Sequence, residues 1–291
     1  MSSVEEHKRD SFTLNRGRLL ILFTGVLWSL GGVFIKSLEL PPVVIAFYRS
    51  IFASLLFSLF VTRSGWRLGF PLLVSVASYT ATMSFFVWAN KLTTAANAIV
   101  LQYTAPIFVF LIIRLWFREP ISGSNLLTLF LGMVGMTIIF SGSRGQQDLQ
   151  GVTVALFSGI VFSIYMVNLR FLKGINPLAL TFVNNLVCSL ALLPLAVTQL
   201  ALSTDQLLAL AAMGVVQLGI PYFLFSKGLE TISLQEASLI VLVEPVLNPV
   251  WVVLIVGEVP SGATLVGGGV ILFSLALRYL RLLTRRDSYT E

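Results

Sequence analysis

Residues 99–123 read IVLQYTAPIFVFLIIRLWFREPISG, and residues 240–262 read IVLVEPVLNPVWVVLIVGEVPSG. Three pairs of residues in these two segments share one separation of 139 positions: Pro106 with Pro245, Glu119 with Glu258, and Gly123 with Gly262. A constant separation across three features indicates an internal duplication. Each copy is an apolar stretch that contains a proline and ends in an acidic turn with glycine.

The duplicated segments belong to a chain that is apolar along most of its length. Of its 291 residues, 56% are hydrophobic and 11% are charged, against about a quarter charged in soluble domains. We therefore expect lipid to surround it. A helix needs about 20 apolar residues to cross the hydrocarbon core. Ten such runs are predicted at residues 19–36, 43–62, 70–90, 95–117, 125–140, 152–172, 177–199, 206–227, 234–256 and 264–283.

The connections between these runs are short, so neighbouring helices should be antiparallel. The longest connection, residues 141–150, divides the runs into two sets of five. Because five is odd, the second set enters the membrane from the opposite side. The predicted fold is an all-α integral membrane protein with ten transmembrane helices in two inverted five-helix repeats. The predicted parts are an N-terminal tail 1–18, a first repeat 19–141, a central loop 142–151, a second repeat 152–283 and a C-terminal tail 284–291.

The lysines and arginines predict the orientation, because cytoplasmic loops are enriched in both. Ten spans place both termini on one side, and 15 of the 19 basic residues fall on that side. Lys36, Arg49, Lys91 and Arg144 are the exceptions. Both termini are predicted to be cytoplasmic, in a multi-pass protein of the cell membrane, with no removable signal peptide.

Several classes of function are disfavoured by what the sequence contains. The basic residues are dispersed and form no stripe for nucleic acid. The single cysteine, Cys188, and the single histidine, His7 in the tail, offer no metal cluster, and no phosphate-binding glycine loop occurs. We expect no cofactor, no metal and no enzyme activity. A lipid-acting enzyme and a non-transporting receptor or scaffold are the alternatives, but catalytic clusters and a large extramembrane segment are lacking.

Four stretches together resemble a known family. They are the two segments quoted above, GVLWSLGGVFIKS (25–37) and FYRSIFASLL (47–56). The chain is similar, over nearly its whole length after the tail, to the EamA type of the drug/metabolite transporter superfamily. The resemblance implies that helices one to four and six to nine line a solute cavity, with helices five and ten outside it. It also implies export of a small metabolite and leaves proton coupling open. It does not indicate which solute is transported.

Two ionisable residues lie within predicted spans without a counterpart in the other repeat. Glu244 is near the centre of its span and aligns with Ala105. It should face the bundle interior, where it either exchanges a proton or pairs with a cationic solute, or else only holds a kinked helix. Asn248, one turn later, could assist either role. Arg49 either snorkels to the outer interface or faces the cavity, where it could bind a carboxylate or pair with Glu244 in one conformation.

Other candidates are weighed in the same way. Pro106 and Pro245 each remove a backbone hydrogen bond and should bend or open their helices. Gln102 and Asn168 are interpreted either as solute contacts or as helix–helix hydrogen bonds. Trp28, Tyr79, Tyr103 and Tyr165 either form an aromatic cavity wall or pack in the bundle. Glu119 and Glu258, at loop edges, are interpreted as caps or interfacial anchors.

Small residues predict close helix approach in the fifth and tenth spans, and they leave a homodimer open. These residues are Gly132, Gly135, Gly267, Gly268 and Gly269. Inverted repeats support alternating access around a midplane site. The sequence therefore predicts a secondary transporter of a small amino-acid-like, polar or amphipathic solute. Efflux is favoured through the resemblance, and an uptake carrier of the same fold is the alternative.

Overall fold

The computed structural model describes residues 3–61, 69–118, 123–142, 145–172, 174–197, 201–232 and 234–287, which are almost entirely helical. These residues form ten spans, as predicted. In chain order they are α1 (Ser3–Ser29) with α2 (Gly31–Ser37), α3 (Pro42–Phe57), α4 (Phe70–Leu92), α5 (Ala95–Gln102) with α6 (Ala105–Trp116), α7 (Gly123–Ser141), α8 (Gly145–Asn168), α9 (Pro177–Ala196), α10 (Thr204–Ala212) with α11 (Ile220–Gly228), α12 (Leu234–Ile240) with α13 (Val243–Val256), and α14 (Gly262–Asp287).

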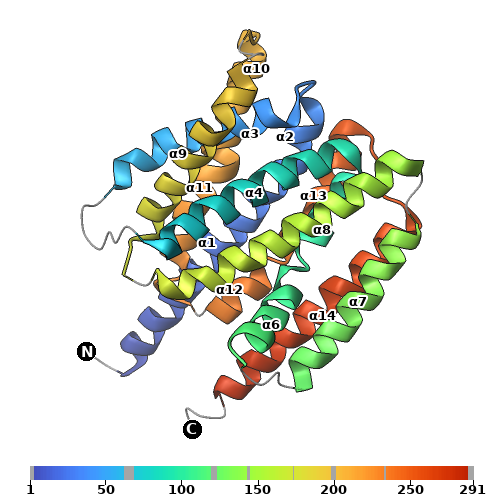
Figure 1. The fold of residues 1–291 in the computed structure, drawn as a ribbon. Helices are drawn as coiled ribbons and strands as arrows, with labels where there is room; N and C mark the ends of the chain where they lie inside the picture. Colours follow the sequence, from blue (N-terminus) through green and yellow to red (C-terminus); the bar gives the residue numbers. More distant parts are fainter. Residues whose placement is uncertain are drawn as a thin grey trace.

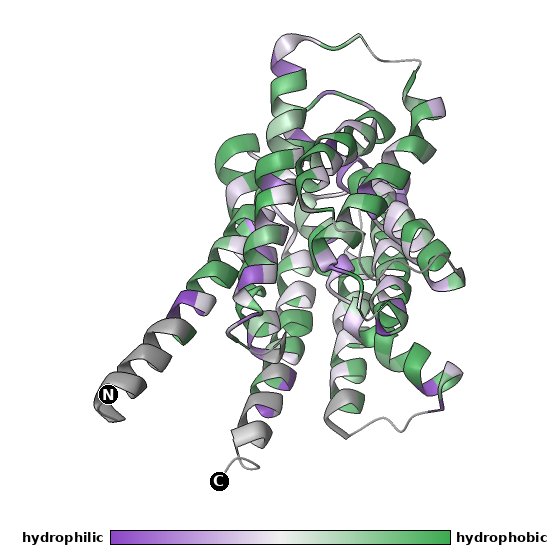
Figure 2. Ribbon diagram, turned by 90° about the vertical axis from the view of Figure 1, so that its left-hand side faces the viewer, coloured by the Kyte–Doolittle hydropathy of each residue, from purple (hydrophilic) through white to green (hydrophobic). Residues whose placement is uncertain are grey.

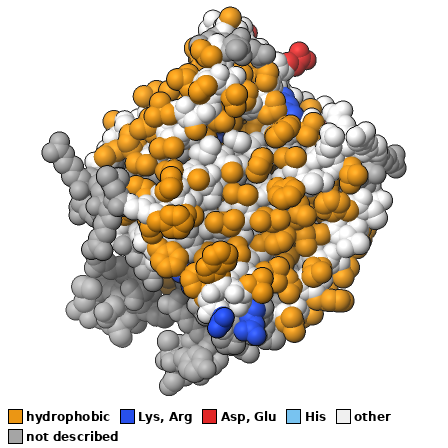
Figure 3. Space-filling model, in the orientation of Figure 1, with side chains coloured by type: hydrophobic (Ala, Val, Ile, Leu, Met, Phe, Trp, Pro, Cys, Tyr) orange, Lys and Arg blue, Asp and Glu red, His pale blue; other side chains and the backbone are white. Residues whose placement is uncertain are grey.

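Length and composition suit these helices to a bilayer. Among the described residues, seven helical stretches are long and apolar enough to cross a membrane, and three shorter apolar helices supply the other spans. Hydrophobic residues line most of the length of the helices, and both termini lie at the same end of the bundle (Figures 1 and 2). On the face shown in Figure 3, hydrophobic side chains cover the middle and charged ones lie towards the two ends. This distribution fits a protein surrounded by lipid.

The helices extend further than the sequence indicates at three places. Helix α1 begins at Ser3 within the predicted N-terminal tail, and α14 continues to Asp287. The predicted central loop 142–151 is also wrong, because α8 already begins at Gly145. Asp148 lies in its first turn, where a negative charge is favourable, and it accepts a hydrogen bond from Thr93 Oγ1. A transmembrane helix can thus continue into the polar residues on either side of its apolar run.

The two halves interlock in a symmetric pattern. The first span packs against the eighth through α1 and α11, and the equivalent third and sixth spans pack through α4 and α8. The second span packs against the seventh, α3 against α9, and the fifth against the tenth, α7 against α14. Exchanging the two halves converts the first–eighth contact into the third–sixth contact. The second–seventh and fifth–tenth contacts are each converted into themselves. This is the arrangement that an inverted repeat requires.

Helices α7 and α14 lie side by side at one edge of the bundle (Figure 1). Their backbones touch at two glycines: a Cβ at Gly135 would lie 2.6 Å from the carbonyl oxygen of Gly267, and one at Gly267 would lie 2.5 Å from that of Gly135. Gly132 faces Ile107, and Gly268 faces Val100. These four glycines therefore serve packing within one chain, and only Gly269, of the five, has open space around it. They give no support to the homodimer that the sequence left open.

Glu258 closes the end of the ninth span. Gly257 before it adopts φ 78°, a left-handed conformation that ends α13. Glu258 Oε1 accepts a hydrogen bond from the backbone nitrogen of Ala95 at 2.7 Å, and Oε2 pairs with Lys36 Nζ at 2.5 Å. Of the two interpretations, cap and interfacial anchor, the contacts of Glu258 match the cap. They connect the end of the first span, the start of the fourth and the end of the ninth. Glu119 lies outside the described residues.

We expect Glu258→Ala to lower the free energy of unfolding by about 1–2 kcal/mol, because it removes a charged cap and an ion pair together. Thermal unfolding of the purified protein in detergent measures the change. Glu230→Ala is the matched control, because the Lys227–Glu230 pair is solvent-exposed and such pairs contribute little. Equal effects of both substitutions would contradict a capping role for Glu258.

Candidate functional site

Two broken helices meet at the centre of the bundle. The fourth span is interrupted at Tyr103 and Thr104, between α5 and α6, and the ninth at Val241 and Leu242, between α12 and α13. Each interruption lies just before one of the repeated prolines, Pro106 and Pro245, whose rings cannot continue the hydrogen-bond ladder of the preceding turn. Both halves of the molecule therefore carry a discontinuous helix at the same position.

A hydrogen bond joins the two interruptions. Tyr103 Oη donates to Glu244 Oε2 at 2.6 Å, and it lies 3.3 Å from the carbonyl oxygen of Val241. Glu244 is in the first turn of α13, so its carboxylate also sits at a positive helix end. Two of the candidate residues, one from each repeat, are thus in direct contact. Discontinuous helices that meet midway across a membrane are typical of solute and ion sites in transporters.

The first span is broken as well, at Leu30 between α1 and α2. The break leaves backbone carbonyls without helical partners. Amide side chains from other spans donate hydrogen bonds to these carbonyls. Asn248 Nδ2 donates to the carbonyl of Ser29 at 3.0 Å, and Gln217 Nε2 donates to that of Trp28 at 3.2 Å. Asn248 is fully buried. Its observed contact therefore stabilises the broken first span, on the side of the molecule where Glu244 also lies.

Small residues make this contact possible. A Cβ at Gly32 would lie 2.6 Å from Asn248 Oδ1, and a Cβ at Gly31 would lie 3.0 Å from Gln217 Nε2. Gln217 belongs to a π-helical segment, Met213–Gly219, that connects α10 and α11. π-Helical turns are uncommon and occur frequently at functional sites. Irregular backbone in the first, eighth and ninth spans is therefore concentrated in one region.

Aromatic rings form two groups in the bundle. Trp28 contacts Tyr222 and Phe225, with ring centroids 5.2 and 5.5 Å apart, between the first and eighth spans. Tyr79 contacts Tyr165 at 5.7 Å, between the third and sixth spans. The two groups occupy equivalent helix pairs of the two repeats. Their faces and edges provide apolar surface with a few hydroxyl groups, which suits an amphipathic ligand.

Arg49 is buried in α3, and only 4% of its surface is exposed. It therefore does not snorkel to the interface, which was one of the two interpretations of the sequence. Its Nη2 donates to Met83 Sδ at 2.9 Å. Among the ion pairs of the described residues, none joins Arg49 to Glu244. In this conformation the two ionisable candidates interact electrostatically but are not in an ion pair.

Two further candidates contact neighbouring helices in this structure. Gln102 Nε2 donates to Ser158 Oγ at 3.0 Å, and Asn168 Nδ2 donates to the carbonyl of Pro71 at 2.7 Å. Both bonds reach between spans, from α5 to α8 and from α8 to the start of α4. They match the helix–helix alternative that the sequence left open, and a solute role for these two side chains remains a hypothesis.

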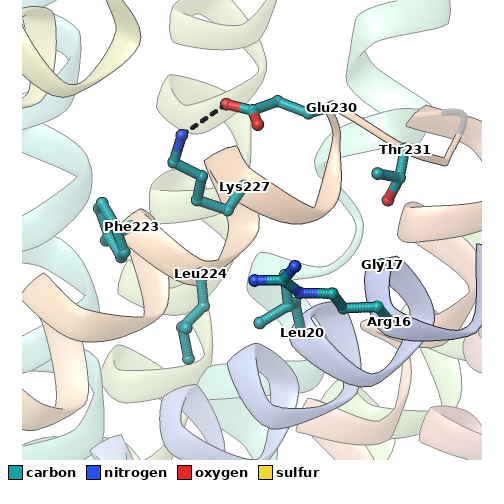
Figure 4. Close-up of a pocket in the computed structure, with 8 residues that line it drawn as sticks. All are labelled: Arg16, Gly17, Leu20, Phe223, Leu224, Lys227, Glu230 and Thr231. Atoms are coloured by element: carbon teal, nitrogen blue, oxygen red, sulfur yellow. Dashed lines mark hydrogen bonds and ion pairs between the residues drawn. The ribbon is translucent and has the colours of Figure 1, made fainter. Parts of the chain in front are cut away.

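A surface pocket of about 420 Å³ lies between α1 and α11 (Figure 4). Its lining residues are Arg16, Gly17, Leu20, Phe223, Leu224, Lys227, Glu230 and Thr231. The ammonium group of Lys227 pairs with Glu230 at 2.9 Å, as Figure 4 shows. None of the candidates from the sequence lines this pocket. No signal in the sequence indicated it, because its two sides come from distant spans whose pairing depends on the fold.

Comparison with known proteins agrees with the fold. The EamA-like transporter family matches residues 15–141 and 149–280. An uncharacterized transporter of Archaeoglobus fulgidus is 25% identical over 90% of this chain and 96% of its own length. The uncharacterized transporter YwfM of Bacillus subtilis is 24% identical over 94% of this chain and 96% of its own.

Two other similarities differ in extent. A riboflavin transporter of Brucella anthropi is 31% identical, but over only 35% of this chain and 38% of its own length. A solved crystal structure with 18% sequence identity superposes with a TM-score of 0.66 and covers 91% of this chain and 97% of that one. At that identity the superposition supports the fold alone.

The ten spans, the two interlocked halves and their facing broken helices define a membrane transporter. More particularly, the chain belongs to the EamA-like transporter family, with one EamA unit in each half. The expectation of a drug/metabolite transporter fold is confirmed. The family also places the chain among transporters and not among enzymes.

Proposed function

We propose that the protein is a secondary carrier that exports a small amino-acid-like, polar or amphipathic metabolite across the cell membrane by alternating access. The observation that carries the proposal is the Tyr103–Glu244 hydrogen bond, which joins the broken helices of the two repeats. A contact between two halves that rock against each other must break or change during transport. The same contact includes a carboxyl group that could carry a proton.

The proposed orientation places both termini in the cytoplasm. Its support is the excess of lysine and arginine on the side of the termini. Outward transport would then carry solute from the side of the termini to the opposite side. Accessibility of cysteines introduced into each tail, probed in intact cells with a membrane-impermeant reagent, tests this orientation.

Counterflow in proteoliposomes tests the transport proposal. Labelled amino acids, nucleosides and sugars form the panel, with riboflavin added because one partial relative is a riboflavin transporter. We expect saturable counterflow of one class, because a carrier exchanges labelled for unlabelled solute without an external gradient. Protein-free liposomes are the control. Folded, inserted protein that exchanges no solute of the panel would contradict the proposal.

A further inference from the structure

Among the described residues, no acidic side chain forms an ion pair with the buried guanidinium group of Arg49. Its one hydrogen bond runs from Nη2 to the sulfur of Met83, and Nη1 has no hydrogen-bond partner. A thioether is a weak acceptor and carries no negative charge. Arginine also stays protonated in proteins. The positive charge is therefore permanent and buried, and among the described residues it has no ion-pair partner.

None of the described side chains near Arg49 forms an ion pair with it. Those that interact with it electrostatically are Tyr79, Tyr222, Cys188 and Glu244. Glu244 is the one carboxylic acid in this set, and it binds Tyr103, with no ion pair to Arg49 among the described residues. A buried charge without a partner is strongly unfavourable. Retention of such a charge in a transporter interior points to a partner that comes from outside the chain.

A second unused donor lies close to the guanidinium group. Tyr79 is 1% exposed, and its hydroxyl group has no hydrogen-bond partner in the part of the chain that the structure describes. Tyr79 and Met83 are four residues apart on α4, so they share the helix face that meets Arg49. The two N–H groups of Nη1 and one phenol O–H thus have no partner among the described residues in the same buried region. Such donors match the oxygens of an anion, and the guanidinium fork suits a carboxylate best.

Aromatic rings lie near these donors. Tyr222, which interacts with Arg49, packs edge-on against Trp28 at 5.2 Å and Phe57 at 6.3 Å. Tyr79 itself packs against Tyr165. A site of this kind fixes one polar group of a ligand with a few donors and contacts its body with apolar surface.

We infer that the transported solute is an organic anion, whose carboxylate binds Arg49 and Tyr79 and whose apolar or aromatic body contacts the surrounding rings. The inference rests on the proposed carrier function and specifies its solute class. It assigns charge recognition to the second and third spans. Glu244, in the ninth, is left for coupling.

Matched acid and amide probes test the inference without knowledge of the natural solute. Phenylacetate and indole-3-acetate differ from phenylacetamide and indole-3-acetamide in charge but hardly in shape. We expect the two acids to raise the thermal unfolding midpoint of the purified protein, because a ligand that binds the folded state stabilises it. The amides should have no effect. Arg49→Gln should abolish the shift, and Tyr79→Phe, which removes one hydroxyl group, should weaken it.

Two further variants separate binding from structure. Arg18→Gln removes an arginine that is half-exposed and paired with Glu236, and it should leave the acid-induced shift intact. Arg49→Met, without ligand, should raise the unfolding midpoint, because it removes a buried charge that lacks an ion-pair partner among the described residues; a fall would overturn the inference by showing that the charge is structurally satisfied. A wild-type protein that no acid of the set stabilises would overturn it too.

Counterflow then distinguishes this inference from the carrier proposal. Exchange confined to solutes without a carboxylate, such as nucleosides and sugars, would overturn the anion site but leave the carrier standing. Acid-induced stabilisation that depends on Arg49, without exchange of any solute, would uphold the anion site and overturn the carrier.

Discussion

Replacement of Gly267 by valine is expected to separate α7 from α14 and to remove most of the folded protein. The added Cβ would lie 2.5 Å from the carbonyl oxygen of Gly135 and close to the backbone nitrogen of Ile139 at 3.2 Å. These are backbone atoms, which cannot rotate away as a side-chain end can. Overpacking typically costs about 1–3 kcal/mol even where side chains can adjust, and the total stability of a protein is only about 5–15 kcal/mol.

Gly269→Val provides a matched control on the same helix, because a Cβ at Gly269 meets no atom within 4 Å. The measurements are the yield of monodisperse protein by size-exclusion chromatography in detergent and the thermal unfolding midpoint. Gly269→Val should resemble the wild type in both. If the two valine variants behave alike, the backbone contact between α7 and α14 is not as close as described.

The ten spans could be predicted because the bilayer imposes a simple requirement on composition. About 20 consecutive apolar residues are needed to cross it, and short turns separate the runs. The interruptions of the fourth and ninth spans could also be expected, because Pro106 and Pro245 cannot continue a regular ladder. These features depend on local sequence, which is why sequence reasoning reached them.

The break at Leu30 and the π-helical segment were not predicted, because neither follows from a local signal as strong as proline. The sequence offered one weaker sign, the adjacent Gly31 and Gly32 in an apolar run. Their small size allows Gln217 and Asn248 to approach the broken first span. Those partners come from residues more than 180 positions away, so only the fold brings them together.

The sequence predicted which residues form the candidate site, but not which side chains they contact. Glu244 and Arg49 stood out because charge is rare inside a membrane. The sequence allowed a salt bridge between them, whereas in this conformation Glu244 binds Tyr103 and Arg49 contacts Met83. Side-chain partners depend on how the spans rotate about their axes, and composition does not determine that rotation.

Substitution of Glu244 by glutamine is expected to reduce pH-gradient-driven transport to background while solute counterflow continues. Glutamine has nearly the same shape and can still accept the hydrogen bond from Tyr103 Oη, which is 2.6 Å from the carboxylate in this structure. It cannot bind and release a proton. Solute exchange needs only the movement of the two halves, but coupling to a proton gradient needs a group that is protonated on one side and deprotonated on the other.

The measurement uses proteoliposomes loaded with the solute that counterflow identifies, with and without an imposed pH gradient. Glu236→Gln is the matched control, because Glu236 is a carboxylate of the same span that pairs with Arg18 towards the surface. It should keep gradient-driven transport. If the pH gradient still drives solute transport by Glu244→Gln, another group carries the proton. If it loses counterflow as well, Glu244 serves solute binding or the junction of the two broken helices, and the division of roles between Glu244 and Arg49 fails.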